Sequence, residues 1–540
     1  MEKEIIALQL AHILGEEFPP EDLQQKLEYP KHSQHGDISF PCFFLAGHFR
    51  RNPKEIAEEL SSQLTHPIFT KTEAVHGYVN IFLDQPFMTN HVLNRVLQEG
   101  YGSHSFGEGE RVVLDLSAPN IAKPFSMGHL RSTIIGNSLA LLAEKCGYTS
   151  VKINYIGDYG TQFGHLLAAY KKWGDEETIQ KAPLKELSNI YVRFHEESKH
   201  DPSLIEEGRE WFKRLEKGGT EAVTLWKWFR ELSLLKFDEI YEQLGISFDM
   251  TRGEAYYSDK MEETISLLEE KGMVEKSDGA LVVRLDEYDL PPCLIVKSNG
   301  TTTYATRDLT AAIDRYRTYG FSKSLYVVGN EQTLHFEQIK KVLEKAGFPW
   351  ASSMQHISFG MMLQNGKKMS TRKGRTILLE DVLQEAGERA GGNNRIGTGA
   401  VIFHDLKHHR LNDVEFSLDD MLTFEGTTGP YIQYTYARAI SLLDKAEFSL
   451  NTELDDSSAW EVVKQLHAFP EEIERAFLQS DPSIIARYVL RLAKYFNQYY
   501  AHTKILQADQ LDKRLTLVFS VTKVLEEGLH LLGMETVEKM

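Results

Sequence analysis

The alternation of apolar and polar residues along the chain predicts a strand, a helix and a strand in close succession. An apolar run at 112–116 leads into a turn that contains Pro119 and Pro124. Apolar positions then recur with helical spacing from about 129 to 145, and the pattern ends at Gly147. A second apolar run follows at 151–156. This order predicts a βαβ unit, with a right-handed crossover helix packed on a parallel sheet.

Elsewhere the pattern divides the chain into three further regions. Residues 1 to about 105 mix helical patterns with loops and end in the strand-like run 77–82, which predicts a small α+β unit. From about 165 to 275 the pattern is charged and helical, as at 207–217 and 229–244, which predicts an insertion between two halves of the sheet. Strand-like runs then return at 281–285, 293–296, 325–328 and 356–359. After about 425 the pattern is helical, most clearly at 460–467, 484–506 and 515–532.

Length and composition narrow the class of protein. A chain of 540 residues is too long for one hydrophobic core, so three or four domains are expected. No apolar run is long enough to span a bilayer, and the first residues are acidic where a signal peptide would be basic. We therefore expect a cytoplasmic protein without a membrane partner. The scattered cysteines Cys42, Cys146 and Cys293 predict reduced core residues.

The net charge of −18 argues against a general nucleic-acid coat protein. It does not exclude RNA, because phosphate binding depends on local clusters of positive charge. Residues 366–375 form one such cluster in this acidic chain, although a run of charges is usually a solvated loop.

Several segments resemble known functional motifs but do not have the residue spacing that those motifs require. Residues 107–112 lack the third glycine of a dinucleotide fingerprint, and 360–368 have one residue too many between the glycines for a phosphate-binding P-loop. His195 and His200 are five residues apart, whereas the metalloprotease motif needs four. His404, His408 and His409 predict a surface patch rather than metal ligands. We therefore predict no metal held by the protein itself.

Five motifs remain, and the first follows the first predicted strand. It reads Asn120-Ile-Ala-Lys-Pro-Phe-Ser-Met-Gly-His-Leu-Arg131 and leads into the helix of the βαβ unit. The free N–H groups and the dipole of a helix N-terminus attract phosphate, and Gly128 allows close approach of a ligand. His129 and Lys123 add donors beside it. The other motifs cover residues 154–164, where the next predicted strand ends, and then 303–308, 328–335 and 368–374.

The first motif resembles the HIGH motif of class I aminoacyl-tRNA synthetases, and its longer pattern resembles the arginyl-tRNA synthetase family. Lys368-Met-Ser-Thr-Arg-Lys-Gly374 resembles the second motif of that class, KMSKS. The resemblance implies a multi-domain α/β fold whose catalytic domain is a Rossmann-like parallel sheet with a helical insertion, between an N-terminal α+β domain and a C-terminal all-α helical bundle. The implied domains are a tRNA elbow-binding domain at 1–108, a catalytic domain at 109–375 with its insertion at about 165–290, a connecting and stem-contact segment at 376–425, and an anticodon-binding bundle at 426–540.

The resemblance implies that ATP and arginine form an arginyl-adenylate, with Mg²⁺ on the phosphates, and that the arginyl group then passes to its tRNA. This chemistry needs positioning and charge stabilisation rather than a protein nucleophile. By resemblance the catalytic residues are Lys123, His129, Lys368, Ser370, Arg372 and Lys373. The motif residues that bind ATP are Asn120, Ala122, Lys123, Pro124, Ser126, Gly128, His129, Leu130 and Met369.

Selection of arginine requires acids, because a guanidinium is planar and always charged. By resemblance Asp308 and Tyr304 line the side-chain pocket, and Gln332 adds a hydrogen bond. Asp115, Ser117 and Asn120 then hold the side chain or the α-amino end. The alternative for Asp308 is an N-cap on a helix that begins near Leu309.

Three positions depart from the usual motifs. Ser126 stands where the first histidine of the HIGH motif would be, and a serine can still donate a hydrogen bond. Thr371 replaces the second lysine of KMSKS, and in the family the lysine upstream of the first motif, here Lys123, is thought to substitute for it. Asp115 replaces a glutamate, which is longer by one methylene.

For the tRNA, the resemblance implies contacts by Tyr431, Tyr434 and Met540. The two tyrosines can stack on anticodon bases or belong to the core of the bundle. The family is usually monomeric, so we expect a monomer. Two other interpretations stay open: an enzyme of the same fold with a small acceptor in place of tRNA, and an RNA-binding or regulatory paralogue without catalysis.

Overall fold

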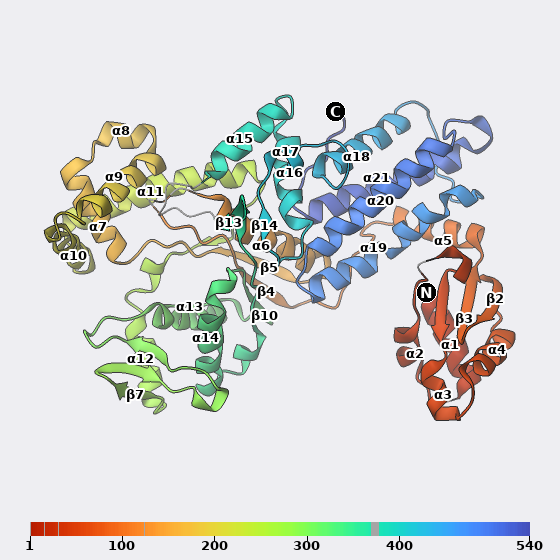
Figure 1. The fold of residues 1–540 in the computed structure, drawn as a ribbon, viewed down its shortest axis with the longest axis horizontal. Helices are drawn as coiled ribbons and strands as arrows, with labels where there is room; N and C mark the ends of the chain where they lie inside the picture. The colour runs from red at the N-terminus through yellow and green to blue at the C-terminus, as the bar shows by residue number, and fades with distance from the viewer. Residues whose placement is uncertain (1, 16, 31, 122, 124, 369–376) are drawn as a thin grey trace. The chain divides into compact units, whose positions relative to one another are not determined.

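The computed structural model describes residues 2–15, 17–30, 32–121, 123, 125–368 and 377–540. It divides into two compact units, each built from separate stretches of the chain. Unit 1 contains Met1–Glu99, Leu442–His467 and Gln498–Ser520, and unit 2 contains Gly100–Ser441, Ala468–Asn497 and Val521–Met540. Figure 1 shows the chain as a ribbon and labels many of the elements of both units. The borders at 108, 375 and 425 stay predictions.

Unit 1 contains the small α+β fold expected near the N-terminus. Its antiparallel sheet has the order β1-β3-β2, with β1 at Ile38–Pro41, β2 at Phe69–Val75 and β3 at Tyr78–Leu83. The helices of this part are α1 (Glu2–Leu14), α2 (Pro20–Lys26), α3 (Phe43–Phe49), α4 (Pro53–Gln63) and α5 (Gln85–Leu97). C-terminal residues pack in the same unit, since Trp460 Nε1 donates to Oδ1 of Asp37 at 2.9 Å.

Unit 2 contains the predicted parallel sheet, in the order β11-β10-β4-β5-β6. The strands are β4 (Arg111–Asp115), β5 (Thr149–Asn154), β6 (Met250–Thr251), β10 (Lys323–Tyr326) and β11 (Met354–His356). Every pairing in this sheet is parallel. Helix α6, at Met127–Lys145, connects β4 to β5, so the predicted βαβ unit is confirmed. It packs closely, since a Cβ on Gly136 would lie 2.4 Å from Cβ of Leu116.

The bounds predicted for the helical insertion, 165–290, stay a prediction. Its helices are α7 (Thr161–Trp173), α8 (Glu176–Lys181), α9 (Pro183–Glu197), α10 (Ser203–Glu216) and α11 (Thr220–Gln243), the yellow part of the chain in Figure 1. The chain then rejoins the parallel sheet at β6. Helix α12 (Met261–Glu270) follows.

The strands expected at 281–285 and 293–296 exist, but they lie outside the parallel sheet. They are β8 (Ala280–Val283) and β9 (Cys293–Val296), which pair antiparallel in the order β7-β8-β9 with β7 at Val274–Ser277. The cause is the turn between β7 and β8, where Asp278 and Gly279 have φ of 49° and 79°. An Asp-Gly pair with positive φ forms a tight hairpin and so commits these strands to antiparallel pairing.

The rest of unit 2 connects the sheet to the C-terminal helices. It contains α13 (Tyr304–Tyr319), α14 (Thr333–Lys345), β12 (Met362–Gln364), β13 (Lys367–Lys368), α15 (Leu379–Arg389), α16 (Asn394–Leu406), β14 (Val414–Glu415), α17 (Leu418–Met421) and α18 (Gly429–Leu443). Strand β12 pairs antiparallel with β13 and parallel with β14.

The helical C-terminal region is also confirmed. Its long helices are α19 (Trp460–Leu478), α20 (Ser483–His502) and α21 (Leu511–Leu531). Within unit 2 they pack on one another, since Phe469 stacks on Tyr488 and a Cβ on Gly528 would lie 2.3 Å from Cγ1 of Val489. Cys42, Cys146 and Cys293 are free and buried, as predicted. No helix in the described part of the chain is long and apolar enough to cross a membrane.

Candidate active site

The first turn of α6 carries the last residues of the first motif. Ser126 is the N-cap residue, and its backbone N–H donates to Nδ1 of His129 at 3.1 Å. Because Nδ1 accepts this hydrogen bond, a neutral His129 carries its proton on Nε2. Burial, together with the charge of Lys123, lowers the pKa of His129 to about 4. His129 is therefore neutral near pH 7 and offers a single N–H donor.

Lys123 connects the first motif to the motif at 154–164, which begins at the end of β5. Its Nζ donates to Oε1 of Gln162 at 3.2 Å, and Nε2 of Gln162 donates to Oδ1 of Asn120 at 3.4 Å. The backbone of Asn120 also forms a parallel bridge with Gly157. The loops after β4 and β5 therefore meet at the carboxyl edge of the sheet, where parallel sheets bind their ligands.

Ser117 belongs to a buried hydrogen-bonded network, although we predicted that it contacts the substrate. Its Oγ lies 2.8 Å from the hydroxyl of Tyr241 and accepts a hydrogen bond from Oγ1 of Thr133, also at 2.8 Å. Its φ is 72°, in the left-handed region that a non-glycine residue seldom adopts. Asn154 Nδ2 donates to the Tyr241 hydroxyl at 3.0 Å, which ties the network to the end of β5. Tyr241 lies in the insertion, and no motif pointed to it.

A group of acids lies beside this edge of the sheet. Asp308 Oδ2 is 2.6 Å from Nε2 of His335, and Oε2 of Glu254 is 3.0 Å from Nη1 of Arg307. Asp308 does not cap a helix, because Thr303 is the N-cap residue of α13 and accepts from the N–H of Thr306. The alternative interpretation of Asp308 as an N-cap is therefore wrong.

Glu254 is the acid of this group whose pKa is shifted into the neutral range. Burial raises the pKa of Glu254 to about 7, with contributions from the charges of Asp308 and Asp158, while Arg307 and Lys123 oppose the rise. Lys123 thus acts electrostatically on both His129 and Glu254. The Nζ of Lys123 that exerts both effects is the one that donates to Oε1 of Gln162 at the sheet edge. No local pattern in the sequence indicated Glu254.

Asp115 already has a cationic partner within the protein. Its Oδ2 lies 2.7 Å from Nη2 of Arg315 in α13, and the two side chains are 7% and 1% exposed. Burial raises the pKa of the Asp115 carboxyl, and the guanidinium of Arg315 opposes that rise. Tyr304, at the start of the same helix, is 65% exposed, and the Arg307 guanidinium lies 5.5 Å from its ring centroid. Gln332 is exposed in the 3-10 turn η4 (Asn330–Gln332).

Part of the predicted site lies outside the described residues. These are Ala122 and Pro124 of the first motif, and Met369, Ser370, Arg372 and Lys373 of the second. The backbone of Lys368 closes β13, directly before the second motif. Gly128 and Leu130 lie in the first turn of α6, where Gly128 is exposed and Leu130 is buried.

The tyrosines predicted to contact tRNA differ in their surroundings. The hydroxyl of Tyr431 accepts from Nδ2 of Asn497 at 3.1 Å, within the helices of unit 2. Tyr434 is 40% exposed, and the guanidinium of Arg438 lies 4.7 Å from its ring centroid. Met540 is 42% exposed. Stacking on anticodon bases stays a prediction for both tyrosines.

The histidines at 404–409 do not form the expected surface patch. His404 is only 7% exposed, and its Nε2 lies 2.9 Å from the carbonyl oxygen of Glu415. It lies on the inner face of α16, next to the buried Asp405. Among the described residues no cluster of three histidine, cysteine or acidic side chains could hold a metal ion.

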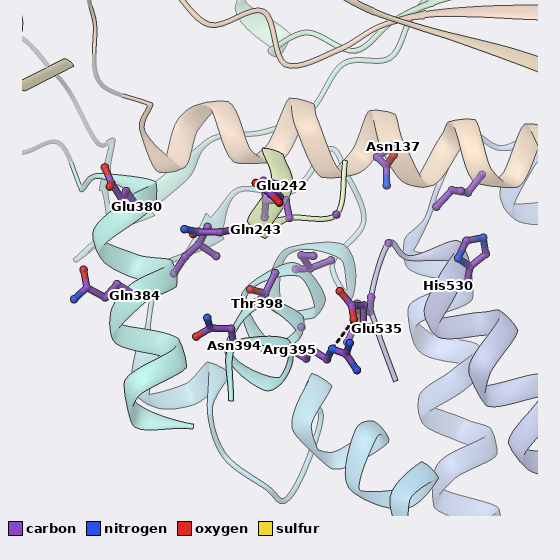
Figure 2. A pocket seen from close by; sticks show the side chains of 18 of the residues that line it. Asn137, Glu242, Gln243, Glu380, Gln384, Asn394, Arg395, Thr398, His530 and Glu535 are labelled. Atoms are coloured by element: carbon purple, nitrogen blue, oxygen red, sulfur yellow. Dashed lines mark ion pairs between the residues drawn. The ribbon is translucent and has the colours of Figure 1, made fainter. Parts of the chain in front are cut away.

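A cavity of about 810 Å³ lies against the middle of α6, at Asn137, rather than at its first turn. Figure 2 shows it between α6, α15, α16 and the C-terminal residues, with the ion pair of Arg395 and Glu535 on one side. None of the predicted site residues lines it. The cavity is therefore a separate feature from the candidate site.

Comparison with known proteins defines the class first. The family described as “tRNA synthetases class I (R), catalytic domain” matches residues 91–418. The families “Arginyl tRNA synthetase N terminal domain” and “DALR anticodon binding domain” match 3–83 and 432–540. The parallel sheet and the edge that carries His129 thus belong to a class I tRNA synthetase.

The relatives then define the family. The chain is 52% identical to “Arginine--tRNA ligase 2” of Bacillus anthracis over 98% of both chains, and 50% identical to “Arginine--tRNA ligase” of Enterococcus faecalis over the full length of both. Its fold matches the arginyl-tRNA synthetase of Thermus thermophilus with a TM-score of 0.82 at 25% identity, over 100% of this chain and 99% of the other. The chain belongs to the arginine–tRNA ligase family.

Proposed function

We propose that the chain joins L-arginine to its tRNA at the edge of the sheet where β4 and β5 end. The observation that supports this proposal is the contact of Lys123 Nζ with Gln162 at this edge, from which its charge acts on His129 at the helix N-terminus and on Glu254 among the acids. One cationic side chain thus acts on a residue at a helix N-terminus suited to phosphate and on a residue in a group of acids suited to a guanidinium.

In the first step the carboxylate of arginine attacks the α-phosphorus of ATP, and pyrophosphate leaves. ATP enters with Mg²⁺ on its phosphates. The Nε2–H of His129 and the ammonium of Lys123 stabilise the negative charge that develops on the phosphate oxygens. The residues of the second motif, Lys368, Ser370, Arg372 and Lys373, act on the same phosphates. The other residues of the first motif are proposed to bind ATP.

In the second step a ribose hydroxyl of the terminal adenosine of the tRNA attacks the arginyl carbonyl carbon, and AMP leaves. The C-terminal helices hold the anticodon, with Tyr431, Tyr434 and Met540 in contact with it, and the N-terminal α+β domain holds the tRNA elbow. We propose that the protein acts as a monomer in the cytoplasm.

For the amino acid, Asp308 is the acid that supports the choice of arginine best. It lies in the first turns of α13, four residues after Tyr304, and both residues therefore share one face of the helix. His335 fixes the orientation of its carboxylate. Glu254 adds a second negative charge when it is deprotonated. Gln332 and Asn120 complete the proposed contacts, whereas Asp115 and Ser117 support the site through Arg315 and Tyr241.

The test is ATP–pyrophosphate exchange with arginine, with and without tRNA, followed by charging of total tRNA with each amino acid in turn. Exchange that needs both arginine and tRNA, with charging by arginine alone, supports the proposal. Exchange without tRNA favours an enzyme with a small acceptor. Absence of exchange under both conditions favours a paralogue without catalysis.

A further inference from the structure

Arg131, the last residue of the first motif, is among the most buried charged residues described, with 1% exposure. Its Nη1 donates to the carbonyl oxygens of Gly360 at 2.7 Å and Asn412 at 2.9 Å, and its Nη2 donates to that of Arg410 at 3.3 Å. Its Nε lies 2.9 Å from Oδ2 of Asp405 in α16. One guanidinium therefore joins α6 to segments more than two hundred positions away in the chain.

The segments that receive these hydrogen bonds also contact each other. The N–H of Gly360 donates to the carbonyl of Arg410 at 2.9 Å, and a Cβ at position 360 would lie 2.5 Å from the carbonyl oxygen of Asn412. These segments continue into β12 and β14, which pair in parallel. Arg131 therefore holds the base of the small sheet β13-β12-β14, whose strand β13 ends at Lys368, where the second motif begins.

The contacts of Arg131 depend on the planar shape of its guanidinium as well as on its charge. Three backbone carbonyls accept from Nη1 and Nη2, and a carboxylate forms an ion pair beside Nε. These groups surround one plane of donors, which an arginine provides and a lysine ammonium does not. An ordinary buried ion pair would explain Asp405. It would not explain why two segments next to the second motif converge on a residue of the first.

We propose that Arg131 is a positioning residue for formation of the adenylate. It holds the first turn of α6, with His129, in a fixed place against the sheet from which the second motif starts. Arg131 touches no substrate, and it acts through the residues that do. This inference rests on the proposed function.

The test compares Arg131→Lys with the wild type in tRNA charging and in arginine-dependent pyrophosphate exchange. Rates are expressed per active site, and the active sites are titrated with a non-hydrolysable analogue of arginyl-adenylate. We expect the kcat per site to fall by about 10- to 100-fold, because small displacements of catalytic groups cost that much. The KM for arginine should change by less than about threefold, because Asp308 and Glu254 are not held by Arg131.

The matched control is Arg514→Lys in unit 1. Arg514 is an arginine whose side chain is 13% exposed, with Nε 3.4 Å from Oδ2 of Asp456 and Nη1 donating to the carbonyl of Lys504. If a substitution acted only by disturbing packing or the geometry of an ion pair, both variants would change similarly. The change would then appear mainly in stability and in the number of active sites. We expect the kcat per site of Arg514→Lys to stay within about twofold of the wild type.

Asp405→Asn is the second variant, because it removes the negative charge beside Arg131 and keeps the three carbonyl contacts. We expect a smaller fall in kcat per site, of about three- to tenfold. If Arg131→Lys or Asp405→Asn folds and still has the kcat per site of the wild type, the inference is wrong. A wild-type protein that does not charge tRNA with arginine would instead overturn the proposed function, so the two failures can be told apart.

Discussion

Asp115 and Arg315 form an ion pair of 2.7 Å between two side chains that are almost fully buried. Asp115 ends β4, and Arg315 lies in α13, so the pair joins the sheet to the helix that also carries Asp308. The ring centroids of Tyr155 and Tyr326 lie 5.1 and 5.3 Å from the guanidinium carbon. The carboxylate that the sequence suggested for substrate arginine thus binds an arginine of the protein itself.

The first prediction concerns the role of this pair. Asp115→Asn should lower the free energy of unfolding of unit 2 by about 3 kcal/mol, because it leaves the buried charge of Arg315 without a partner. The urea midpoint at neutral pH measures this loss. The double variant Asp115→Asn with Arg315→Met should recover part of it, because neither charge then remains. An unchanged midpoint with a much higher KM for arginine would instead show that Asp115 binds the substrate.

The second prediction concerns Asp308. Asp308→Asn should lower kcat/KM for arginine by about 100-fold, because a charged hydrogen bond to the guanidinium is lost. The KM for ATP should change by less than about threefold. Steady-state charging kinetics with each substrate varied in turn measure both effects. The control is His335→Gln, which keeps a hydrogen-bond donor near Asp308 and should cost less. Equal losses for arginine and ATP would contradict the assignment of Asp308 to the arginine pocket.

Much of the fold could be predicted because its signals are local. The βαβ unit at 111–154 follows from two apolar runs around one helical pattern, and the C-terminal helices follow from their length. The pairing of β8 and β9 was not predicted. Their apolar runs resemble buried parallel strands, and the one local signal against that arrangement is the turn at Asp278 and Gly279, which joins β7 to β8.

In the candidate site, too, the residues that are close in the sequence could be predicted to lie together, and the distant ones could not. His129, Ser126 and Lys123 lie within one short motif, so sequence alone could place them together. The partners of Arg131 at Gly360 and Asn412 are 229 and 281 positions away, and no periodicity connects them. Glu254 and Tyr241 follow no recognised pattern, and tertiary packing alone brings them to the sheet edge. The pairing of Asp115 with Arg315 likewise appears only when α13 packs on β4.

The third prediction is a pH dependence that originates at Glu254. Its pKa is raised from 4.5 to about 7, so its negative charge appears as the pH rises through neutrality. We expect kcat/KM for arginine to rise about tenfold between about pH 6 and pH 8, as the deprotonated fraction of Glu254 increases. Charging assays across that range measure the profile. Glu254→Gln should flatten it, and a profile that keeps its shape in this variant would exclude Glu254 as its source.

The raised pKa of Glu254 affects stability in the opposite direction, because it makes the folded state less stable as the pH rises. A carboxyl whose pKa is higher in the folded state binds its proton more tightly there, so its contribution is full below about pH 4.5 and is lost as the pH rises through about 7. Glu254→Gln should therefore unfold at a higher urea concentration than the wild type at pH 8, and at nearly the same concentration at pH 4. Glu263→Gln, at an exposed acid whose partner is Arg317, is a suitable control. A variant less stable than the wild type at pH 8 would contradict the prediction.

The last prediction concerns unit 1, where Glu2 lies 2.6 Å from Nε2 of His467 and is only 3% exposed. Burial alone would raise the pKa of Glu2, but the hydrogen bond and charge of His467 outweigh it and lower the pKa from 4.5 to about 2. A lowered pKa stabilises the fold above about pH 4.5, and this contribution is lost as the pH falls through about 2. Glu2→Gln should therefore cost about 3 kcal/mol at neutral pH and clearly less at pH 3, whereas Glu4→Gln, at an exposed neighbour, should cost little at either pH. Thermal unfolding of the full chain at both pH values measures the difference, and an equal loss at pH 7 and pH 3 would show that the ion pair is not its cause.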